Sequence, residues 1–353
     1  MAKKATLADV AEAAGVSVFT VSQAINERPG LAPQTREKVL RVADELSYIP
    51  NRSARELRRP DRSQVAVLAG GSSNAYYIDM IRGVTRVVQR HRRTLLMMDI
   101  ASEGVYDAET EDAVVKELIR TGIAGVISTL VLRPESLALF EKWGVPVVFV
   151  DSSPRELNTQ VGYFGTDNLA AGHQVGRYLV DLGLRDWLFA AYPSTWSTRE
   201  PREQGLRDAA KILGANLHVI ESANNPMAAA EAIQEYLITY PFRPDVLIAG
   251  NNPILQGALQ ALRYLKLRIP EDIAVFAYDE FPWAPLVAPA ITVLDEHAEG
   301  IGEAAAECLM RIINEQVQAD ERREDTKPVF TSEDHVLAPT TIIARHSCGE
   351  QPG

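Results

Sequence analysis

Five side chains between residues 19 and 26 have the chemistry to contact a DNA duplex: Phe19, Thr20, Ser22, Gln23 and Asn26. A glutamine can hydrogen-bond adenine through both amide atoms, Thr and Ser can hold phosphates, and an exposed Phe can press on a thymine methyl group. They alternate with apolar positions at helical spacing, Val18, Val21 and Ile25. The pattern therefore predicts a helix with a polar face. The alternative is an ordinary helical hairpin whose polar face is solvated.

Three short helices are expected to position these side chains. Thr6 suits the N-cap of a first helix with apolar positions at Leu7, Val10, Ala11 and Ala14, and Gly15 suits its end. Ser17 would cap the second helix, which we expect to reach about Asn26. A third helix over about 34–47 would bury Val39, Val42, Ala43 and Leu46. Two short helices joined by a tight turn are typical of a helix-turn-helix unit, here predicted over residues 1–50.

Residues 51–62 indicate a basic linker. Pro50 and Pro60 bracket a segment with arginines at 52, 55, 58 and 59 and one apolar residue, Leu57. A helix this short is marginal in water and should order only when a partner holds it. The arginines could bind phosphates, and Leu57 could insert between base steps in the minor groove. The alternative is a charged interdomain linker.

The distribution of charge supports this division. The whole chain carries a net charge of −11, but residues 1–62 hold eleven Lys and Arg against eight Asp and Glu. A basic head on an acidic body is expected where only the head meets phosphate. We find no apolar run long enough to span a membrane and no signal-peptide pattern, so we expect a cytoplasmic protein. The two cysteines, Cys308 and Cys348, have no metal-ligand spacing.

Two segments, TLADVAEAAGVSVFTVSQAIN and TREKVLRVADELSYIPNRSARELRR, resemble the head and hinge of the LacI/GalR family of bacterial repressors. The resemblance implies that Val18, Phe19 and Gln23 face bases, that Ala54 lines the hinge contact and that Leu57 is the minor-groove wedge. It also implies backbone contacts from Thr6, Ser17, Thr20, Asn26, Tyr48 and Asn51. Gln23 stands where the family usually has Arg, so adenine becomes a more plausible target than guanine. With Ser22 and Arg55 as phosphate contacts, these residues complete the predicted DNA-binding set.

From residue 63 onward, short apolar runs alternate with helix-length segments. The runs are 64–70, 94–100, 123–129, 145–151, 187–192, 245–250 and 272–279, and the segments include 107–121, 168–183, 201–214, 226–240 and 253–266. Apolar strands separated by helices indicate parallel sheets covered on both faces. We therefore predict an all-α head plus an α/β core of two doubly wound parallel-sheet lobes, divided near residue 160, with a ligand crevice at the carboxyl ends of the strands.

The resemblance continues through the core, 63–346, and implies the fold of the periplasmic sugar-binding proteins. Lobe 1 would comprise about 63–160 plus 295–320, with a last helix over 297–315, and lobe 2 about 161–294 plus 325–346. Residues 318–328 are expected to form a solvated loop and 347–353 a loose tail. Polar groups near the strand ends are the candidate effector-binding residues, with Trp196 or Trp283 as an aromatic face: Asn74, Tyr76, Asp151, Trp196, Arg202, Asn252, Asp279 and Glu296. The family usually carries Asp at the position of Asn252 and Gln at that of Glu296.

No catalytic motif or metal-ligand pattern is present, so we expect neither an enzyme nor a bound cofactor or metal. The sequence favours a transcriptional regulator, most simply a repressor, that binds pseudo-palindromic operator DNA under the control of a small effector such as a sugar or sugar derivative. We expect a homodimer, with a tetramer left open. The alternative is a cytoplasmic sugar- or nucleoside-binding protein, or an activator, without a repressor role. A sugar-modifying enzyme is a weaker alternative.

Overall fold

The computed structural model describes residues 6–25, 30–46, 63–70, 74–101, 106–152, 161–322 and 329–350. The chain forms two compact units, residues 1–61 and 62–353. We call them the head and the core, and each is described by itself.

The head contains three helices, α1 (Leu7–Ala14), α2 (Val18–Ile25) and α3 (Pro33–Glu45). The predicted caps of α1 are confirmed: Thr6 and Asp9 form a reciprocal capping box, and Gly15 ends the helix at a φ of 63°. A small apolar cluster joins the three helices through Val10, Ala11, Ala14, Val21, Ala24, Val39 and Ala43. The expectation that Leu46 is buried was wrong. It follows the last turn of α3 and is 39% exposed.

The core contains two six-stranded sheets of the same topology. The first has the order β11-β5-β4-β3-β1-β2, and the second β12-β10-β9-β8-β6-β7. All strand pairs are parallel except β10 with β12. The first sheet comprises β1 (Gln64–Ala69), β2 (Thr94–Asp99), β3 (Gly125–Ser128), β4 (Val147–Val150), β5 (Gly162–Thr166) and β11 (His335–Ala338). The second comprises β6 (Asp186–Ala191), β7 (Asn216–Glu221), β8 (Val246–Ala249), β9 (Ala274–Tyr278), β10 (Thr292–Asp295) and β12 (Thr341–Ile343).

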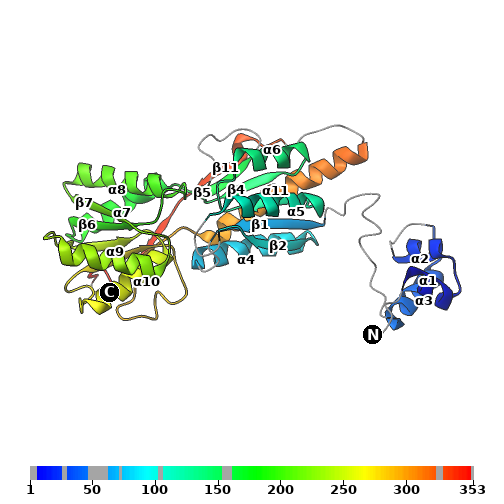
Figure 1. Ribbon diagram of the computed structural model, residues 1–353, viewed down its shortest axis with the longest axis horizontal. Coiled ribbons are helices and arrows are strands. Elements are labelled where there is room, and N and C mark those ends of the chain that lie inside the picture. The colour runs from blue at the N-terminus through cyan, green and yellow to red at the C-terminus, as the bar shows by residue number, and fades with distance from the viewer. Residues whose placement is uncertain are drawn as a thin grey trace. The chain divides into compact units, whose positions relative to one another are not determined.

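Helices cover both faces of each sheet (Figure 1). In the first lobe these are α4 (Ala75–Arg90) and α11 (Ala298–Arg322) on one face, and α5 (Ala108–Arg120) and α6 (Pro134–Lys142) on the other. In the second lobe, α7 (Asn168–Asp181) and α8 (Arg199–Leu213) lie opposite α9 (Pro226–Thr239) and α10 (Asn252–Tyr264). Alternate residues of β1 and β6 enter the two layers, as the two-residue period of a strand requires. The predicted two-lobed α/β fold is confirmed.

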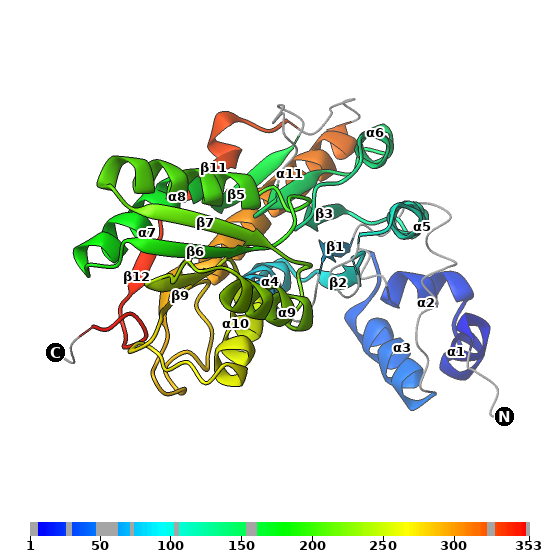
Figure 2. The ribbon, with the colours of Figure 1, turned by 60° about the vertical axis from the view of Figure 1, so that its left-hand side comes forward.

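The predicted division of the lobes near residue 160 was wrong. Strand β5 pairs with β4 in the first sheet, so the chain first crosses to the second lobe between β5 and α7. It returns between β10 and α11, and crosses again between β11 and β12, which lie in different sheets (Figure 2). The predicted assignment of 325–346 to lobe 2 was therefore also wrong in part, because β11 belongs to the first sheet. β5 reads GYFGT, with two glycines and one β-branched residue, so its membership depends on pairing rather than on local sequence.

Two expectations for the C-terminal part of the chain also need correction. Helix α11 continues to Arg322 rather than ending near 315, so part of the expected solvated loop is helical, and 323–328 lie outside the described residues. The expected loose tail is packed as far as residue 350. Ser347 Oγ donates to the Val275 carbonyl (2.6 Å) and accepts from the Thr292 amide (2.8 Å), and Cys348 is buried. These backbone contacts fix the segment to the second sheet.

Candidate functional site

The exposed face of α2 carries the base-facing candidates of the head. Phe19 is 67% exposed and Val18 48% exposed, while Val21 and Ala24 on the same helix are buried. Gln23 lies four residues after Phe19, so the two side chains are neighbours on the helix surface. An exposed phenylalanine beside a bidentate amide is an arrangement that can contact base edges. This is the geometry that the sequence predicts for a reading helix.

Ser17 and Thr20 are engaged with each other at the start of α2. The Thr20 amide donates to Ser17 Oγ (3.1 Å), and the two hydroxyls are 2.8 Å apart. They therefore stabilise the N-terminus of α2, where backbone amides point outward and favour an anion such as phosphate. Six of the predicted DNA contacts lie outside the described residues: Asn26, Tyr48, Asn51, Ala54, Arg55 and Leu57.

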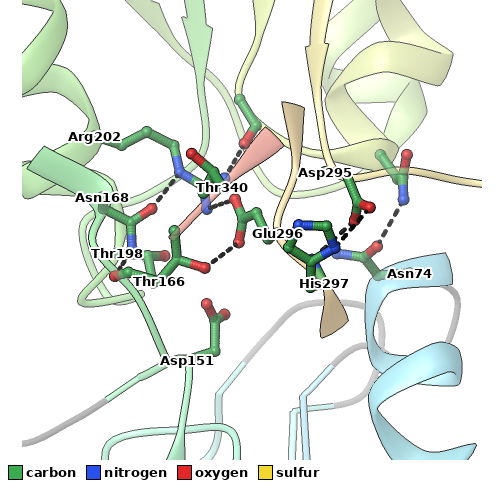
Figure 3. A network of polar contacts seen from close by, with 12 residues as sticks. Asn74, Asp151, Thr166, Asn168, Thr198, Arg202, Asp295, Glu296, His297 and Thr340 are labelled. Carbon is green, nitrogen blue, oxygen red and sulfur yellow. Dashed lines mark hydrogen bonds and ion pairs between the residues drawn. The ribbon is translucent and has the colours of Figure 1, made fainter. Parts of the chain in front are cut away.

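In the core, a buried polar cluster joins the two lobes around Arg202 of α8 (Figure 3). Its guanidinium donates to Asn168 Oδ1 (2.8 Å), to the Gly250 carbonyl (2.7 Å) and to Glu296 Oε1 (2.5 Å). Glu296 Oε2 also accepts from the Thr166 hydroxyl (3.1 Å). Glu296 directly follows β10, and Thr166 is the last residue of β5. This network therefore lies where the chain crosses between the lobes.

A second contact between the lobes comes from two asparagines. Asn74 caps α4 of the first lobe by accepting from the Tyr76 amide (3.0 Å), and the same oxygen accepts from Asn252 Nδ2 at the start of α10 (3.1 Å). Both asparagines are buried. A group that binds at these residues would therefore contact both lobes at once.

Asp151 and Asp279 occupy equivalent places in the two lobes. Each is buried and directly follows the third strand in its sheet order, β4 or β9, and each has a left-handed backbone, with φ of 66° and 71°. Non-glycine residues rarely adopt this conformation, and such strain concentrates at functional sites. Burial, reinforced by the charge of Glu296, raises the pKa of Asp151 to about 7 and that of Asp279 well above its ordinary value.

Several buried polar atoms near these carboxyl groups have no hydrogen-bond partner among the described residues. They are Tyr76 Oη, Asp151 Oδ1, Ser152 Oγ, Trp196 Nε1, Asn252 Oδ1 and Tyr278 Oη. Buried donors and acceptors are normally satisfied, because each unpaired group costs about 1–3 kcal/mol. Their concentration between the lobes indicates a site built for a polar ligand.

A cavity of about 300 Å³ reaches this cluster at Tyr76 and Glu296. Its lining also includes the carboxylates of Asp79, Glu280, Asp295 and Glu299. The volume is at the small end of the range for ligand sites, about 300–1,000 Å³. Among the described residues no group of three or more His, Cys, Asp and Glu could hold a metal ion. In the same part of the chain, we find no helix with the length and hydropathy needed to cross a bilayer.

The structure brings together the eight predicted effector-binding residues, but three details differ from expectation. Arg202 directs its donors to protein groups rather than to open space. Asn168, which was not among the predicted site residues, is part of the Arg202 network, while its neighbour Asp167 caps α7. Trp283, a candidate for the aromatic face, instead packs on Phe281 at 4.1 Å between ring centroids.

Sequence reasoning found Tyr76 but missed three other tyrosines of the cluster, Tyr77, Tyr192 and Tyr278. Tyr77 Oη donates to Asp151 (3.3 Å), and Tyr278 lies under the Arg202 guanidinium, 4.2 Å from its ring centroid. Tyr192 is buried beside Trp196 with its hydroxyl 2.8 Å from that of Thr198. Tyr278 is the last residue of β9, and Tyr192 directly follows β6. Their position at the ends of apolar strands could have identified them from the sequence.

Comparison with known proteins decides the family. Residues 6–51 match the family described as "Bacterial regulatory proteins, lacI family", and residues 177–348 match a periplasmic binding protein-like domain. The chain belongs to the LacI family. It is a DNA-binding transcriptional regulator of that family rather than an enzyme.

Relatives within the LacI family align with almost the whole chain. The ribose operon repressor of Escherichia coli (strain K12) is 27% identical over 327 residues, which cover 91% of this chain and 97% of that repressor. The HTH-type transcriptional repressor PurR of Vibrio vulnificus (strain CMCP6) is also 27% identical, over 96% of this chain and 98% of its own length.

Solved structures show the same fold. The lac repressor dimer bound to operator and the anti-inducer ONPF has a TM-score of 0.80 at 21% identity, over 98% of this chain and 99% of that one. The transcriptional regulator CelR in complex with cellobiose has a TM-score of 0.68 at 25% identity, over 97% of this chain and 99% of that one.

Proposed function

We propose that this LacI-family protein is a sequence-specific repressor whose operator binding is controlled by a small effector held between the two lobes of the core. The observation that carries the proposal is the buried cluster that combines groups from both lobes and leaves six polar atoms without hydrogen-bond partners among the described residues. Relatives named for a ribose operon, and a solved structure titled as a cellobiose complex, favour a sugar or sugar derivative as the effector.

The candidate DNA contacts are those assigned to the head and linker in the sequence. Phe19, Gln23 and Val18 contact bases, Leu57 wedges the minor groove, and the hydroxyl, amide and arginine side chains hold the backbone. Two chains pair as a homodimer, so that two heads reach the half-sites of a pseudo-palindrome. Support comes from the exposed face of α2 and from the structural neighbour titled as a dimer bound to operator.

Control acts through the crossings between the lobes. Thr166 and Glu296 lie at segments that change lobe, and Asn252 at the start of α10 contacts Asn74 of the other lobe, so a ligand bound to them favours one relative arrangement of the two sheets. A ligand shifts such an equilibrium only by its difference in affinity for the two arrangements. Release of the operator on effector binding is the direction we propose.

The experiment that tests this function uses the full-length protein and an operator selected from random duplexes. A panel of sugars, phosphorylated sugars and nucleosides is screened by thermal shift, because a bound ligand stabilises the folded state. We expect a stabilising compound to change operator affinity by about 5- to 150-fold. Asn252→Ala should lose this response, while Asn216→Ala, an exposed asparagine on β7, should keep it. A compound that stabilises the protein without changing operator affinity would instead indicate a binding protein without a regulatory role.

A further inference from the structure

The polar cluster between the lobes contains more carboxyl groups than cations. Asp151, Asp279 and Glu296 are all buried, and Arg202 is the one buried guanidinium that faces them among the described residues. Arg202 forms its ion pair with Glu296, at 2.5 Å. Neither Asp151 nor Asp279 forms an ion pair with any residue that the structure describes. Two buried carboxyl groups, one from each lobe, are therefore left without a cation in contact.

Within the part of the chain that the structure describes, every other group that faces these two aspartates is neutral or acidic. Asp151 accepts from the Tyr77 hydroxyl, and Asp279 accepts from the backbone amide of Asn252. The remaining titratable groups close enough to influence them come from α4, β5, β6, β9 and the segment after β10: Tyr76, Tyr163, Tyr192, Tyr278 and Glu296. Burial raises the pKa of all four tyrosines, which keeps their phenols neutral.

Two of the buried polar atoms without a partner are hydrogen-bond acceptors, so a ligand would have to supply a donor to them. Asp151 Oδ1 and Asn252 Oδ1 are buried oxygens without a hydrogen-bond partner among the described residues. Asp151 is 7% exposed and Asn252 is 1% exposed, so solvent does not compensate them. Tyr76 lines the cavity, and aromatic faces attract cations, as the Tyr278 ring already does for the Arg202 guanidinium at 4.2 Å. These observations are separate from the excess of buried carboxyl groups over cations.

The cavity that reaches the cluster is also acidic. Its described lining contains five carboxylates and no lysine or arginine. Outer carboxylates of this lining are already paired: Asp79 with Arg82 (2.8 Å), Glu280 with Arg345, and Glu299 with Arg86. Among the described residues, the buried carboxyl groups that lack a cation in contact are therefore those inside the cluster, at Asp151 and Asp279.

We propose that the effector is a small organic cation, an amine or an amidine, whose charged group binds between Asp151 and Asp279. This inference rests on the proposed function and narrows its ligand. The cation supplies N–H donors to the free carboxylate oxygen of Asp151 and to Asp279, and the rest of the molecule lies against the aromatic rings. An amino sugar combines a sugar scaffold, the effector class proposed above, with a cationic group that matches the charge of the two aspartates.

Matched pairs of compounds test the proposal on the full-length protein. The probes are D-glucosamine with D-glucose, D-galactosamine with D-galactose, and 1,4-diaminobutane with 1,4-butanediol, at pH 7 and constant ionic strength. We expect the amine of at least one pair to bind about 10- to 100-fold more tightly than its hydroxyl partner, as hydrogen bonds to charged groups do relative to neutral ones. Asp279→Asn should remove that preference. Equal or tighter binding of the hydroxyl compounds would overturn the proposal.

A second measurement does not require the effector to be found. If Asp279 lacks a cationic partner, Asp279→Asn should raise the melting temperature of the ligand-free protein, and more at pH 8 than at pH 5. Asp334→Asn is the matched control, since Asp334 is a buried aspartate paired with Arg311 at 2.6 Å, and its loss should lower the melting temperature. A lower melting temperature for both variants at pH 8 would overturn the proposal.

The two proposals fail in different ways. A selected operator that responds to a neutral sugar, with Asp279→Asn more poorly folded at pH 8, would overturn the cationic effector and leave the repressor intact. Preferential binding of an amine by a protein that selects no operator would do the opposite. Both measurements are made on one preparation of the full chain.

Discussion

Arg202 of the second lobe forms an ion pair, removed from water, with Glu296, where the chain crosses back to the first lobe. It is 3% exposed and its partner Glu296 is 1% exposed. Removing one partner of such a pair leaves the other charge buried and unpaired, whereas removing both is often tolerated. The residue is therefore a structural element of the site as much as a ligand contact.

We expect Arg202→Met to lower the free energy of unfolding by about 3–5 kcal/mol. The double variant Arg202→Met, Glu296→Met should recover most of that loss. Urea unfolding checks both, with Arg268→Met as the control, because Arg268 and Asp272 form an exposed pair. A single variant as stable as the control would contradict the structural role.

Asp151 makes the stability of the ligand-free core depend on pH. Its pKa is raised from 3.8 to about 7, so the folded state binds the proton more tightly than the unfolded chain does. The stabilisation from this proton is complete below about pH 4 and is lost as pH rises towards 7. Asp151→Asn should therefore have a flatter stability profile between pH 4 and 8 than the parent chain. Parallel profiles, measured by thermal unfolding across that range, would contradict the raised pKa.

At the scale of elements, glycines set the closest helix contacts. A Cβ on Gly302 of α11 would lie 2.1 Å from the Met80 carbonyl oxygen of α4, and a Cβ on Gly83 of α4 would lie 2.1 Å from the Glu299 carbonyl oxygen. The two helices thus approach through facing glycines. α4 begins beside Asn74, and α11 follows Glu296, so this contact also positions two parts of the effector site.

Gly302→Ala should separate α4 from α11 and destabilise the core by about 1–3 kcal/mol or more, the usual cost of overpacking. Gly300→Ala is the matched control two residues earlier, where an added Cβ meets no atom within 4 Å. It should leave stability unchanged or slightly raised. Equal effects of the two substitutions on thermal unfolding would contradict the close contact.

Elements with strong local patterns could be predicted from the sequence, and those set by pairing could not. The runs that became β1, β4, β6 and β9 are continuous and apolar, and their positions were right within about two residues. β5 contains two glycines, and the edge strands β11 and β12 have only four and three residues, so their sheet and lobe depend on partners distant in sequence. The boundary near residue 160 was wrong for this reason.

The same distinction applies to the site. Residues such as Asp151 and Asp279 could be found because polar side chains that end apolar strands converge at one edge of a parallel sheet. That Arg202 binds Glu296 could not be predicted, since the two lie 94 positions apart and meet only through the lobe crossings. The excess of buried carboxyl groups over cations could not be predicted either, because it depends on that pairing.

At the scale of the whole molecule, we predict that the linker over residues 51–62 kinks the DNA when the protein is bound at its operator. Leu57 lies outside the described residues, so this prediction comes from the sequence and its family resemblance. Leu57→Ala should weaken binding to the operator much more than binding to random duplex, because only a correctly seated wedge kinks its site. Arg55→Ala should weaken both, since a phosphate contact carries little sequence information. Equal losses for Leu57→Ala would contradict the wedge.

The most direct test of the central claim is the ratio of affinities of the full-length protein for a selected pseudo-palindromic duplex and for random duplex, at about 0.15 M salt. The account predicts that the selected duplex binds about 1,000-fold more tightly or better, as specific regulators do. Gln23→Ala should reduce that ratio. A ratio near one, with and without the amine and sugar probes, would contradict it.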